Sequence, residues 1–591
     1  MPYRLAGYAS LLLAAAVGAW MYVQTQAEEL WGYAPLALYL LLYVGVNSLI
    51  VARSGRTSGA NNLLSAGTGL LLGLGFPGIA PVPFLLLVAF VPLWILHRKL
   101  RTEEAGYGRV FAHGFNAFLL YNVLATYWVT NTGLGAGLFA VLANSLLMCL
   151  PWLAFHWTSR RSPRVAYLAF AACWLSFEYL HYNWPLNWPW LTLGNGFMQW
   201  PSLVQWYELT GALGGSAWIL ACNFLALRLY TALREPGVPV PVAASKNRLP
   251  ALTAIVVLLP LAGSVLRYVT YTPGNVGEVT VGAIQPNFEP HYEKFANNQG
   301  AQIDTFRRLS LAALREGPLD YLLYPETSFG RVNEDDPLAA APLALLTEEL
   351  RSKGLRHLIT GVDAYHVFAA GEPLTPAVRT FRNGSGAYEA LNAAVQVDLQ
   401  TNATQSYRKG VFVPGAESFP FRKVFFFLED WVNSLGGTVA GRGTQERRLP
   451  LTGDHARVAP VICYESVFGE YFTDYINEGA QAIFVLTNDG WWDNTAGHRQ
   501  HLWLSSLRAI ETRRAVVRSA NVGACAFIDQ RGHIEQRTVY DRAGFLRGTV
   551  RLSEGRTLYV RWGDAIARVA LLLAGMILLG NLARSLRRQT T

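Results

Sequence analysis

Long runs of residues without a charged side chain constrain this chain more than any other feature of its sequence. No Asp, Glu, Lys or Arg occurs at residues 5–27, and none occurs between Arg56 and His97. A helix needs roughly 20 predominantly apolar residues to cross the hydrocarbon core of a bilayer. With 52% apolar and only 15% charged residues, the composition is not typical of a soluble enzyme. The runs predict a polytopic α-helical membrane domain.

Ten spans can be placed from these runs and from the breaks between them. One pair lies between residues 57 and 96, broken at 76–81, and another lies within 111–157, turning near Asn131. The others are expected near residues 5–27, 32–51, 165–180, 213–230, 249–266 and 565–583. The alternative for the first span is a cleaved signal peptide, although its apolar core is long for one. The Trp- and Pro-rich segment 181–190 is expected in an aromatic belt at a membrane face.

Arg and Lys gather in short loops between alternate spans. The clusters lie at Arg53 and Arg56, and within 98–109, 160–164, 234–248 and 584–588. Counting spans from a cytoplasmic N-terminus places all clusters on one side, which the positive-inside rule identifies as the cytoplasm. Because this distribution accounts for the formal net charge of +9, we expect no nucleic-acid binding. The long polar region then lies on the extracytoplasmic side.

The polar region at residues 272–561 is expected to fold as a separate domain. Short apolar strands, for example at 279–284 and 482–487, alternate with helices such as 498–514. Such alternation predicts an α/β layered fold inserted into the membrane protein. The expected organisation is an extra N-terminal hairpin at 1–55, a membrane domain of about seven helices at 56–271, the polar domain, and a final helix with a basic tail at 562–591. The five cysteines show no paired spacing and no CxxC, so neither a disulfide framework nor a zinc site is indicated.

Three apolar strands of the polar domain are each followed by a reactive side chain, namely Glu326, Lys409 and Cys463. A thiol needs a base to become a thiolate, and a tetrahedral intermediate needs a cation or N–H donors for its oxyanion. Glu326 can be that base, while Lys409 and the backbone N–H after Cys463 can stabilise the oxyanion. Together the three residues predict acyl transfer. Taken alone, each residue has an ordinary alternative: Glu326 as a solvated loop carboxylate, Lys409 as a strand-end lysine and Cys463 as a buried apolar cysteine.

The motifs around these residues resemble the nitrilase, or carbon-nitrogen hydrolase, superfamily. The resemblance rests on Pro325-Glu326-Thr327, on the spacing from Lys409 to Glu417, on Cys463-Tyr464-Glu465, and on Asn488-Asp489-Gly490-Trp491. About seven spans, then this domain, then one last span is the layout of the apolipoprotein N-acyltransferase family within that superfamily. The family implies a four-layer α-β-β-α sandwich with a Glu-Lys-Cys triad. The two leading spans lie outside the resemblance, and Pro414-Gly415-Ala416-Glu417 replaces the usual Pro-Phe-Gly-Glu.

The resemblance also implies roles for individual residues. Glu326 would be the general base, Lys409 the stabiliser of the tetrahedral intermediate, and Cys463 the nucleophile that carries a thioester-linked acyl chain. Supporting positions are Glu417, Tyr464 and Glu465, the last of which has a purely structural role as its alternative. The acyl chain would come from a phospholipid and pass to the α-amino group of the diacylglyceryl-modified cysteine of an apolipoprotein. The family implies no metal or other cofactor, and it implies a multi-pass protein of the bacterial cytoplasmic membrane whose catalytic domain faces the periplasm.

Further substrate contacts are expected at two places. Asn488 and Trp491 belong to a motif whose alternative role is to shape a turn. Phe425, Phe426 and Trp431 lie in an aromatic segment that we predict to dip into the bilayer as an arm or lid, the alternative being burial in the core. Two functions of other classes remain open from the sequence, a membrane-tethered amidase that uses water as acceptor and a lipid- or lipoprotein-binding scaffold without catalysis.

Overall fold

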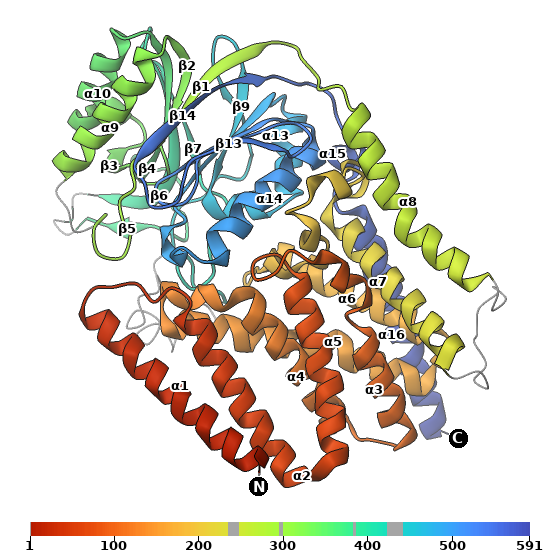
Figure 1. Ribbon diagram of the computed structural model, residues 1–591. Coiled ribbons are helices and arrows are strands. Elements are labelled where there is room, and N and C mark those ends of the chain that lie inside the picture. The colour runs from red at the N-terminus through yellow and green to blue at the C-terminus, as the bar shows by residue number, and fades with distance from the viewer. Residues whose placement is uncertain are drawn as a thin grey trace.

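The computed structural model describes residues 2–234, 248–294, 299–381, 384, 386–421 and 441–590. Helices fill the lower half of the molecule in Figure 1, and two β-sheets with their covering helices fill the upper half. The predicted aromatic arm, with Phe425, Phe426 and Trp431, lies outside the described residues.

Most of the predicted spans coincide with long apolar helices. The helical half contains α1 (Pro2–Gln26), α2 (Ala34–Gly75), α3 (Val91–Thr102), α4 (Tyr107–Thr126), α5 (Leu134–Arg161), α6 (Ala166–Asn183), α7 (Tyr207–Arg234), α8 (Leu249–Thr270) and α16 (Ala565–Thr590). Within the described residues, seven helical segments are long and apolar enough to cross a membrane. The other three predicted spans fall on the second half of α2, on α4 and on α6, so the count of ten stays a prediction.

The helix α2 contains two of the predicted spans in one continuous element. A straight helix of its 42 residues would be about 63 Å long. Its two ends nevertheless meet neighbouring residues of one helix, because Arg499 donates to the Tyr33 hydroxyl and Gln500 donates to the Pro77 carbonyl. The element therefore reverses direction, as Figure 1 shows at the bottom of the molecule, and both of its halves run between the same two levels.

The upper half is a four-layer sandwich, as the family resemblance implied. Among the described residues, one sheet has the order β14-β1-β2-β4-β6-β5, with β3 beside β4 and β7 beside β6, and the other has the order β13-β12-β11-β10-β9-β8. The strands are β1 (Glu278–Gln285), β2 (Leu319–Leu323), β3 (Phe329–Asn333), β4 (Leu355–Val367), β5 (Arg379–Thr380), β6 (Ala387–Asp398), β7 (Thr404–Arg408), β8 (Leu451–Thr452), β9 (Arg457–Ile462), β10 (Ala482–Thr487), β11 (Val516–Ala520), β12 (Ala526–Ile528), β13 (Ile534–Arg537) and β14 (Gly544–Arg551). Where the sheets face each other, the rings of Tyr321 and Phe484 lie 5.4 Å apart.

Helices cover the outer faces of both sheets. The helices α9 (Gln299–Arg315) and α10 (Ala341–Arg351) cover the first sheet, and α13 (Tyr471–Asn477) and α14 (Ala496–Thr512) cover the second. Their apolar faces complete the core, since Phe306 of α9 and Leu343 of α10 pack in one cluster with Leu322 of β2. The strands β1, β2 and β4 are parallel, as are β9, β10 and β11. The carboxyl ends of parallel strands meet at one edge of a sheet, and there the chain presents its reactive side chains.

The two halves are joined by buried polar contacts as well as by the chain. Gln500 of α14 accepts hydrogen bonds from the indoles of Trp128 and Trp190, at 3.1 and 2.7 Å, and donates to the carbonyls of Pro77 and Ala125. Trp190 is only 1% exposed. The prediction of an aromatic belt is therefore wrong for this tryptophan, because its indole is used to dock the sandwich rather than to face lipid.

A second junction lies at the start of α7. Gly211 has a φ of +64° and kinks the helix, a conformation that glycine adopts without the steric cost of a Cβ. The freed N–H of Ala212 donates to Glu511 of α14 at 3.1 Å. Close by, Arg513 binds Glu208 at 2.6 Å and Gln205 at 2.7 Å. A carboxylate of the sandwich thus caps a membrane helix.

The two helices that precede the family resemblance form a tight hairpin. A Cβ at Gly7 would lie 2.8 Å from the Leu49 side chain, and one at Gly45 would lie 2.8 Å from that of Leu11. Small residues at such crossings let two membrane helices approach closely. The loop of the hairpin reaches the sandwich, where Gly32 donates its N–H to Asp493 at 2.8 Å. The extra hairpin therefore contacts the turn that follows β10.

Candidate active site

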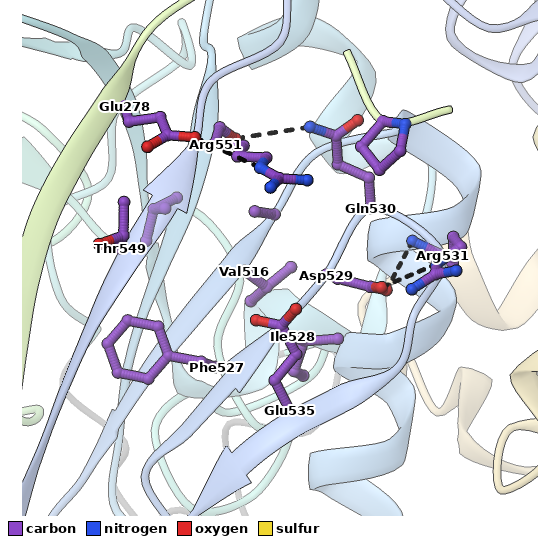
Figure 2. A pocket seen from close by; sticks show the side chains of 13 residues that line it. Glu278, Val516, Phe527, Ile528, Asp529, Gln530, Arg531, Glu535, Thr549 and Arg551 are labelled. Atoms are coloured by element: carbon purple, nitrogen blue, oxygen red, sulfur yellow. Dashed lines mark hydrogen bonds and ion pairs between the residues drawn. The ribbon is translucent and has the colours of Figure 1, made fainter. Parts of the chain in front are cut away.

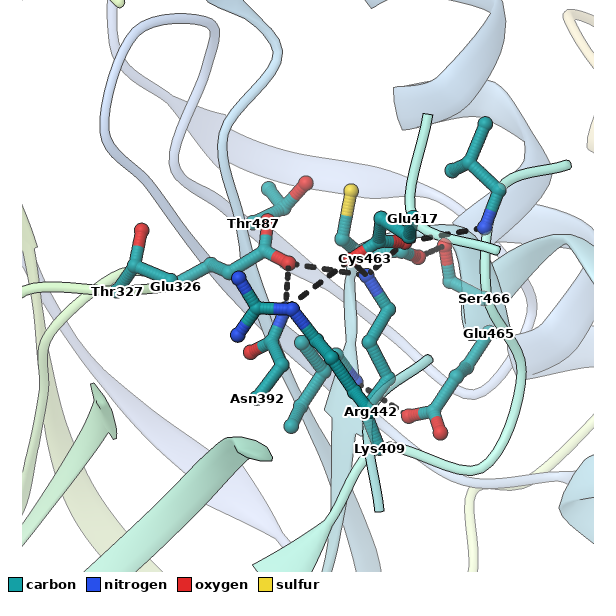
Figure 3. A network of polar contacts seen from close by, with 12 residues as sticks. Glu326, Thr327, Asn392, Lys409, Glu417, Arg442, Cys463, Glu465, Ser466 and Thr487 are labelled. Carbon is teal, nitrogen blue, oxygen red and sulfur yellow. Dashed lines mark hydrogen bonds and ion pairs between the residues drawn. The ribbon is translucent and has the colours of Figure 1, made fainter. Parts of the chain in front are cut away.

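Glu326, Lys409 and Cys463 converge at one end of the sandwich, as Figure 3 shows. Each follows a strand directly or closely, Glu326 after β2, Lys409 after β7 and Cys463 after β9. All three side chains are buried, with exposed fractions of 7%, 1% and 8%. Residues separated by more than fifty positions in sequence are thus brought together by two different sheets.

Cys463 occupies a strained turn. Its φ of +48° lies in the left-handed region, which costs a non-glycine residue on the order of 1 kcal/mol or more. The turn is held from below, because the Ser466 hydroxyl donates to the Cys463 carbonyl at 2.7 Å and the His501 imidazole lies 3.2 Å from the same oxygen. Thr487 at the end of β10 lies near the thiol (Figure 3) and opposes the rise that burial causes in its pKa. The backbone thus turns away from β9 immediately at the sulfur-bearing residue.

Lys409 lies between two carboxylates. Its Nζ is 3.0 Å from Glu326 Oε1 and 2.9 Å from both oxygens of Glu417. Asn392 of β6 donates its amide to Glu326 Oε1 at 2.8 Å and to Glu417 Oε1 at 3.3 Å. The Val413 N–H donates to Glu417 as well. Every carboxylate oxygen that binds Lys409 therefore has a second donor in contact, which fixes the ammonium group in place.

These neighbours determine which groups are charged. Burial raises the pKa of the Cys463 thiol, Glu326 adds to the rise and Lys409 opposes it. Burial would also raise the pKa of Glu326, but Lys409 and Asn392 hold it below its usual value. For Lys409, burial would lower the pKa, and the charges of Glu326 and Glu417 more than offset that and raise it. The resting site therefore holds a neutral thiol beside an ionised carboxylate and an ammonium group.

Glu465 connects two of the three reactive residues. Its Oε1 accepts from the Tyr407 and Tyr471 hydroxyls and from the Gly410 N–H, at 2.6 to 2.7 Å, and its Oε2 accepts from the Ile462 N–H at 2.7 Å. Gly410 follows Lys409 and Ile462 precedes Cys463. The fully buried carboxyl group thus ties the backbone beside the lysine to the backbone beside the thiol, which supports the structural role that the sequence left as an alternative.

Tyr464 reaches the membrane half of the molecule. Its hydroxyl donates to the Asn187 carbonyl at 3.0 Å, and its ring packs edge-on against that of Phe468, with centroids 5.3 Å apart. Phe468 in turn contacts the ring of Tyr182 at the end of α6. The residue after the thiol is therefore anchored on the Trp- and Pro-rich segment.

Asn488 and Trp491 lie in the turn between β10 and α14, and their predicted contact with substrate stays a prediction. Asn488 is 2% exposed, and its Oδ1 accepts from the Asn521 amide at 3.1 Å. This contact favours the alternative in which Asn488 shapes the turn. Trp491 is partly exposed and packs edge-on against His291, with ring centroids 5.2 Å apart.

The sequence analysis missed a buried ionic network under the nucleophile. Asp489 contacts His501 Nδ1 at 2.8 Å and also pairs with Arg518, while the Thr487 hydroxyl donates to it at 2.9 Å. His501 carries this network to Ser466 at 2.7 Å. No local motif marked His501 as a member of this network, because its partners Asp489 and Ser466 lie 12 and 35 positions away in the chain. Asn392 was missed because a single Asn within a strand has no distinguishing pattern.

A separate cavity of about 270 Å³ lies at the edge of the sandwich (Figure 2). Four of its five charged side chains form two ion pairs, Arg551 with Glu278 at 3.3 Å and Arg531 with Asp529 at 2.9 Å, and the fifth is Glu535. None of Glu326, Lys409 and Cys463 lines it. The cavity is therefore distinct from the cluster around the thiol.

Comparison with known proteins bears on both halves of the chain. Residues 68–225 match the model of the apolipoprotein N-acyltransferase N-terminal domain, and residues 280–557 match the carbon-nitrogen hydrolase model. The apolipoprotein N-acyltransferase of Chlorobaculum tepidum is 30% identical over 532 residues, which cover 87% of this chain and 95% of the relative. This chain belongs to the apolipoprotein N-acyltransferase family. The predicted resemblance is thereby confirmed, with the fold class and the enzyme class that it implied.

Other members of the family align over similar lengths. The enzyme of Azotobacter vinelandii is 30% identical and that of Geobacter metallireducens 27% identical, over 88% and 85% of this chain and 95% and 92% of the relatives. Among solved structures, an amidase from Nesterenkonia sp. matches 51% of this chain and 97% of its own, with 16% identity and a TM-score of 0.32. A carbon-nitrogen hydrolase from Helicobacter pylori matches 49% of this chain and 94% of its own, with 13% identity and a TM-score of 0.33.

Proposed function

We propose that this protein transfers an acyl chain from a phospholipid, through a thioester on Cys463, to the α-amino group of a diacylated apolipoprotein. The observation that carries the proposal is the cluster of buried Glu326 and Lys409 with partly buried Glu417 beside a strand-end thiol, in a chain of this family. The same cluster without the membrane half would serve equally well for an amidase. The polar junctions that dock the sandwich on the membrane helices favour lipid substrates instead.

The first half-reaction forms the thioester. Glu326 takes the thiol proton as the Cys463 sulfur attacks the ester carbonyl carbon of the phospholipid. The resulting oxyanion is stabilised by the Lys409 ammonium group and the N–H that follows Cys463. When the tetrahedral intermediate collapses, the carbon–oxygen bond breaks and the lysophospholipid oxygen receives the proton from Glu326. An acyl-enzyme and a free lysophospholipid result.

The second half-reaction uses the same groups in reverse order. The α-amino group of the acceptor attacks the thioester carbon and loses a proton to Glu326, and the Cys463 sulfur leaves and takes that proton back. Glu417 and Asn392 keep Lys409 in place during both steps, since each contacts the Lys409–Glu326 pair or one of its members. One covalent intermediate allows donor and acceptor to use a single cavity in turn.

The membrane half reduces the cost of reaching lipid substrates. Extraction of an acyl chain into water would cost roughly 0.8 kcal/mol for each exposed CH₂ group. A thiol placed close to the bilayer surface avoids most of this cost. The side of the membrane is part of the proposal too, because the basic loops favour a periplasmic position for the sandwich. We further propose that the chain divides near residues 55, 271 and 561, as the sequence predicted.

The test follows the acyl group. The purified protein in detergent is incubated with a phospholipid whose acyl chain is labelled, and a hydroxylamine-sensitive adduct at Cys463 is sought by mass spectrometry. A diacylated lipopeptide is then added, and we expect the label to appear on its α-amino group. Cys463→Ser should give no thioester adduct, while Cys525→Ser, at another buried cysteine, serves as the matched control. Release of the label only as fatty acid would favour the hydrolase, and the absence of any adduct would favour the scaffold.

A further inference from the structure

A second buried lysine lies beside the candidate general base. Lys294 follows β1 in the loop before α9, and its side chain is 6% exposed. Its Nζ donates to the backbone carbonyl of Glu326 at 2.9 Å and to the Thr327 hydroxyl at 2.8 Å. Neither the motifs nor the family resemblance pointed to this residue. Its ammonium group binds the same short turn that presents the Glu326 carboxylate to Lys409.

That turn is strained and closely packed. Thr327 has a φ of +50°, which a β-branched residue adopts only when surrounding contacts impose it. From below, Gly361 of β4 approaches so closely that a Cβ there would lie 2.5 Å from the Glu326 Cα. Ser328 donates its N–H to the Gly361 carbonyl at 2.7 Å. Lys294, from the loop before α9, binds the Glu326 carbonyl and the Thr327 hydroxyl. The turn is therefore held by β4 and by this loop.

The lysine is itself positioned by its own loop. The Glu289 carbonyl accepts from the Lys294 N–H at 2.7 Å, and the Lys294 carbonyl accepts from the Gln302 amide of α9 at 2.6 Å. Upstream, Phe288 is held at both its N–H and its carbonyl by Asn521. These hydrogen bonds fix the backbone of the loop at Lys294, and this limits the positions that the ammonium group can take.

The number of charged groups around Glu326 explains why a second lysine is favourable at this turn. Glu326 and Glu417 both bind Lys409, so two carboxylates meet one ammonium group at that point. A buried charge without a partner is strongly destabilising. A second ammonium group at the Glu326 turn balances the second carboxylate. It also adds positive charge where a thiolate develops during the reaction.

We propose that Lys294 is a positioning residue of the acylation reaction, which fixes the Glu326 turn and acts as a second cation for the ionised base and the developing thiolate. The proposal rests on the function proposed above, and it deepens that function. The described contacts of the Lys294 ammonium group are with the Glu326 backbone carbonyl and the Thr327 hydroxyl. Lys294 acts through Glu326, whose carboxylate remains the group that takes the proton.

The surroundings of Lys294 make its charge sensitive to pH. Burial lowers the pKa of Lys294 to about 8, and the charges of Glu326, of Cys463 when its thiol is ionised, and of Asp363 oppose this. The first two follow strands β2 and β9, Asp363 lies on β4, and the acidic groups of its own loop are Glu289 and Glu293. A lysine of this kind is charged at neutral pH and loses its proton as the pH rises through about 8.

The experiment compares three variants across pH. Lys294→Met removes the charge and nearly keeps the volume, Thr327→Val removes one hydrogen-bond partner and keeps the charge, and Lys353→Met is the control at an exposed lysine. The rate of acyl-enzyme formation is measured in single turnovers with labelled phospholipid. We expect Lys294→Met to be at least tenfold slower and to shift the acidic limb of the pH–rate profile upward by about one unit, because loss of a nearby cation raises the pKa of Glu326. Thr327→Val should slow acylation less than Lys294→Met does, and the acidic limb of its pH–rate profile should stay at the wild-type pH.

A second measurement does not depend on the proposed function. The Cys463 peptide is followed by mass spectrometry during alkylation with iodoacetamide at pH 7.5, and Lys294→Met is expected to react about three- to tenfold more slowly, because less thiolate is present. The inference would be overturned if Lys294→Met were alkylated at the wild-type rate and kept the acidic limb of its pH–rate profile at the wild-type pH. It would also be overturned if the variant lost the same fraction of its acylation rate at every pH. If the wild-type protein forms no acyl adduct, the proposed function fails, while the alkylation rates still decide the role of Lys294.

Discussion

Glu465 shows how much a single buried carboxyl group organises in this site. Its two oxygens accept four hydrogen bonds from segments that carry Lys409 and Cys463. In Glu465→Gln the amide group can no longer accept from the Ile462 N–H, which leaves a buried donor unsatisfied at a cost of about 1–3 kcal/mol. We expect a lower melting temperature and slower acylation. Differential scanning fluorimetry in detergent measures the first and the labelled-lipid assay the second.

The control for Glu465 is Glu478→Gln. Glu478 pairs with Arg447 on the surface, where both side chains are substantially exposed, and such pairs contribute little. Equal melting temperatures for the wild-type protein and Glu465→Gln would contradict the structural role assigned to Glu465.

Glu511 gives the protein a pH-dependent stability. Burial raises the pKa of Glu511 to about 7, from a usual value of 4.5, and Arg508 opposes the rise. The native protein therefore holds this proton more tightly than the unfolded chain does. Its contribution is full below pH 4.5 and is lost as the pH rises through 7, by an amount on the order of 3 kcal/mol. We therefore expect thermal stability to fall between about pH 4.5 and pH 7.5.

Glu511→Gln isolates this effect. The amide oxygen can still accept from the Ala212 N–H, but the side chain does not titrate. The variant should lose less stability than the wild-type protein over the same pH range in melting experiments. Parallel curves for the two proteins would exclude Glu511 as the source.

At the residue scale, the sequence could predict the reactive groups but not most of their partners. Glu326, Lys409 and Cys463 each stand in a local motif at a strand end, and strand ends can be recognised from apolar runs. Lys294 and Asn392 contact Glu326 from 32 and 66 positions away. No local pattern marks either of them, because only the packing of separate strands brings them to the turn.

At the scale of elements, the extra N-terminal hairpin is the part of the chain that lies outside the family resemblance. Its loop is tied to the sandwich by the Gly32 N–H and the Asp493 carboxylate. Asp493→Ala should weaken that attachment by about 1 kcal/mol, while Asp493→Asn keeps an acceptor and serves as the control. We expect faster cleavage after Glu28 or Glu29 by a glutamyl endopeptidase in the alanine variant. Identical cleavage rates in all three proteins would show that Asp493 does not hold the loop.

Element boundaries were predictable where the pattern was local. The strands β9 and β10 and the helix α14 lie within a few residues of their predicted positions. The strand β14 was missed, because its sequence, GFLRGTVR, mixes polar and apolar residues. It pairs antiparallel with β1 across more than 250 positions of the chain. Such an edge strand is identified by its partner rather than by its own periodicity.

At the scale of the whole molecule, Gln500 is the contact on which the docking of the two halves depends most. Its side chain bonds Trp128, Trp190, Pro77 and Ala125. Gln500→Leu keeps the volume but leaves two buried indole N–H groups and two carbonyls without this partner, so we expect a loss of about 2–5 kcal/mol. Gln400→Ala, at an exposed turn, is the control. Melting in detergent and limited proteolysis between the halves are the measurements, and wild-type behaviour of Gln500→Leu would contradict the prediction.

The kinked start of α7, capped by Glu511, and the glutamine on α14 attach the sandwich to the membrane helices at two separate places. In the reaction proposed above, these contacts would hold the sulfur atom at one height relative to the bilayer, and lipids of every kind would bring their ester bond to that height. Chains of different length differ only in the part that remains among the other lipids. We therefore expect the depth of the scissile bond, rather than the length of the chain attached to it, to govern the choice of donor.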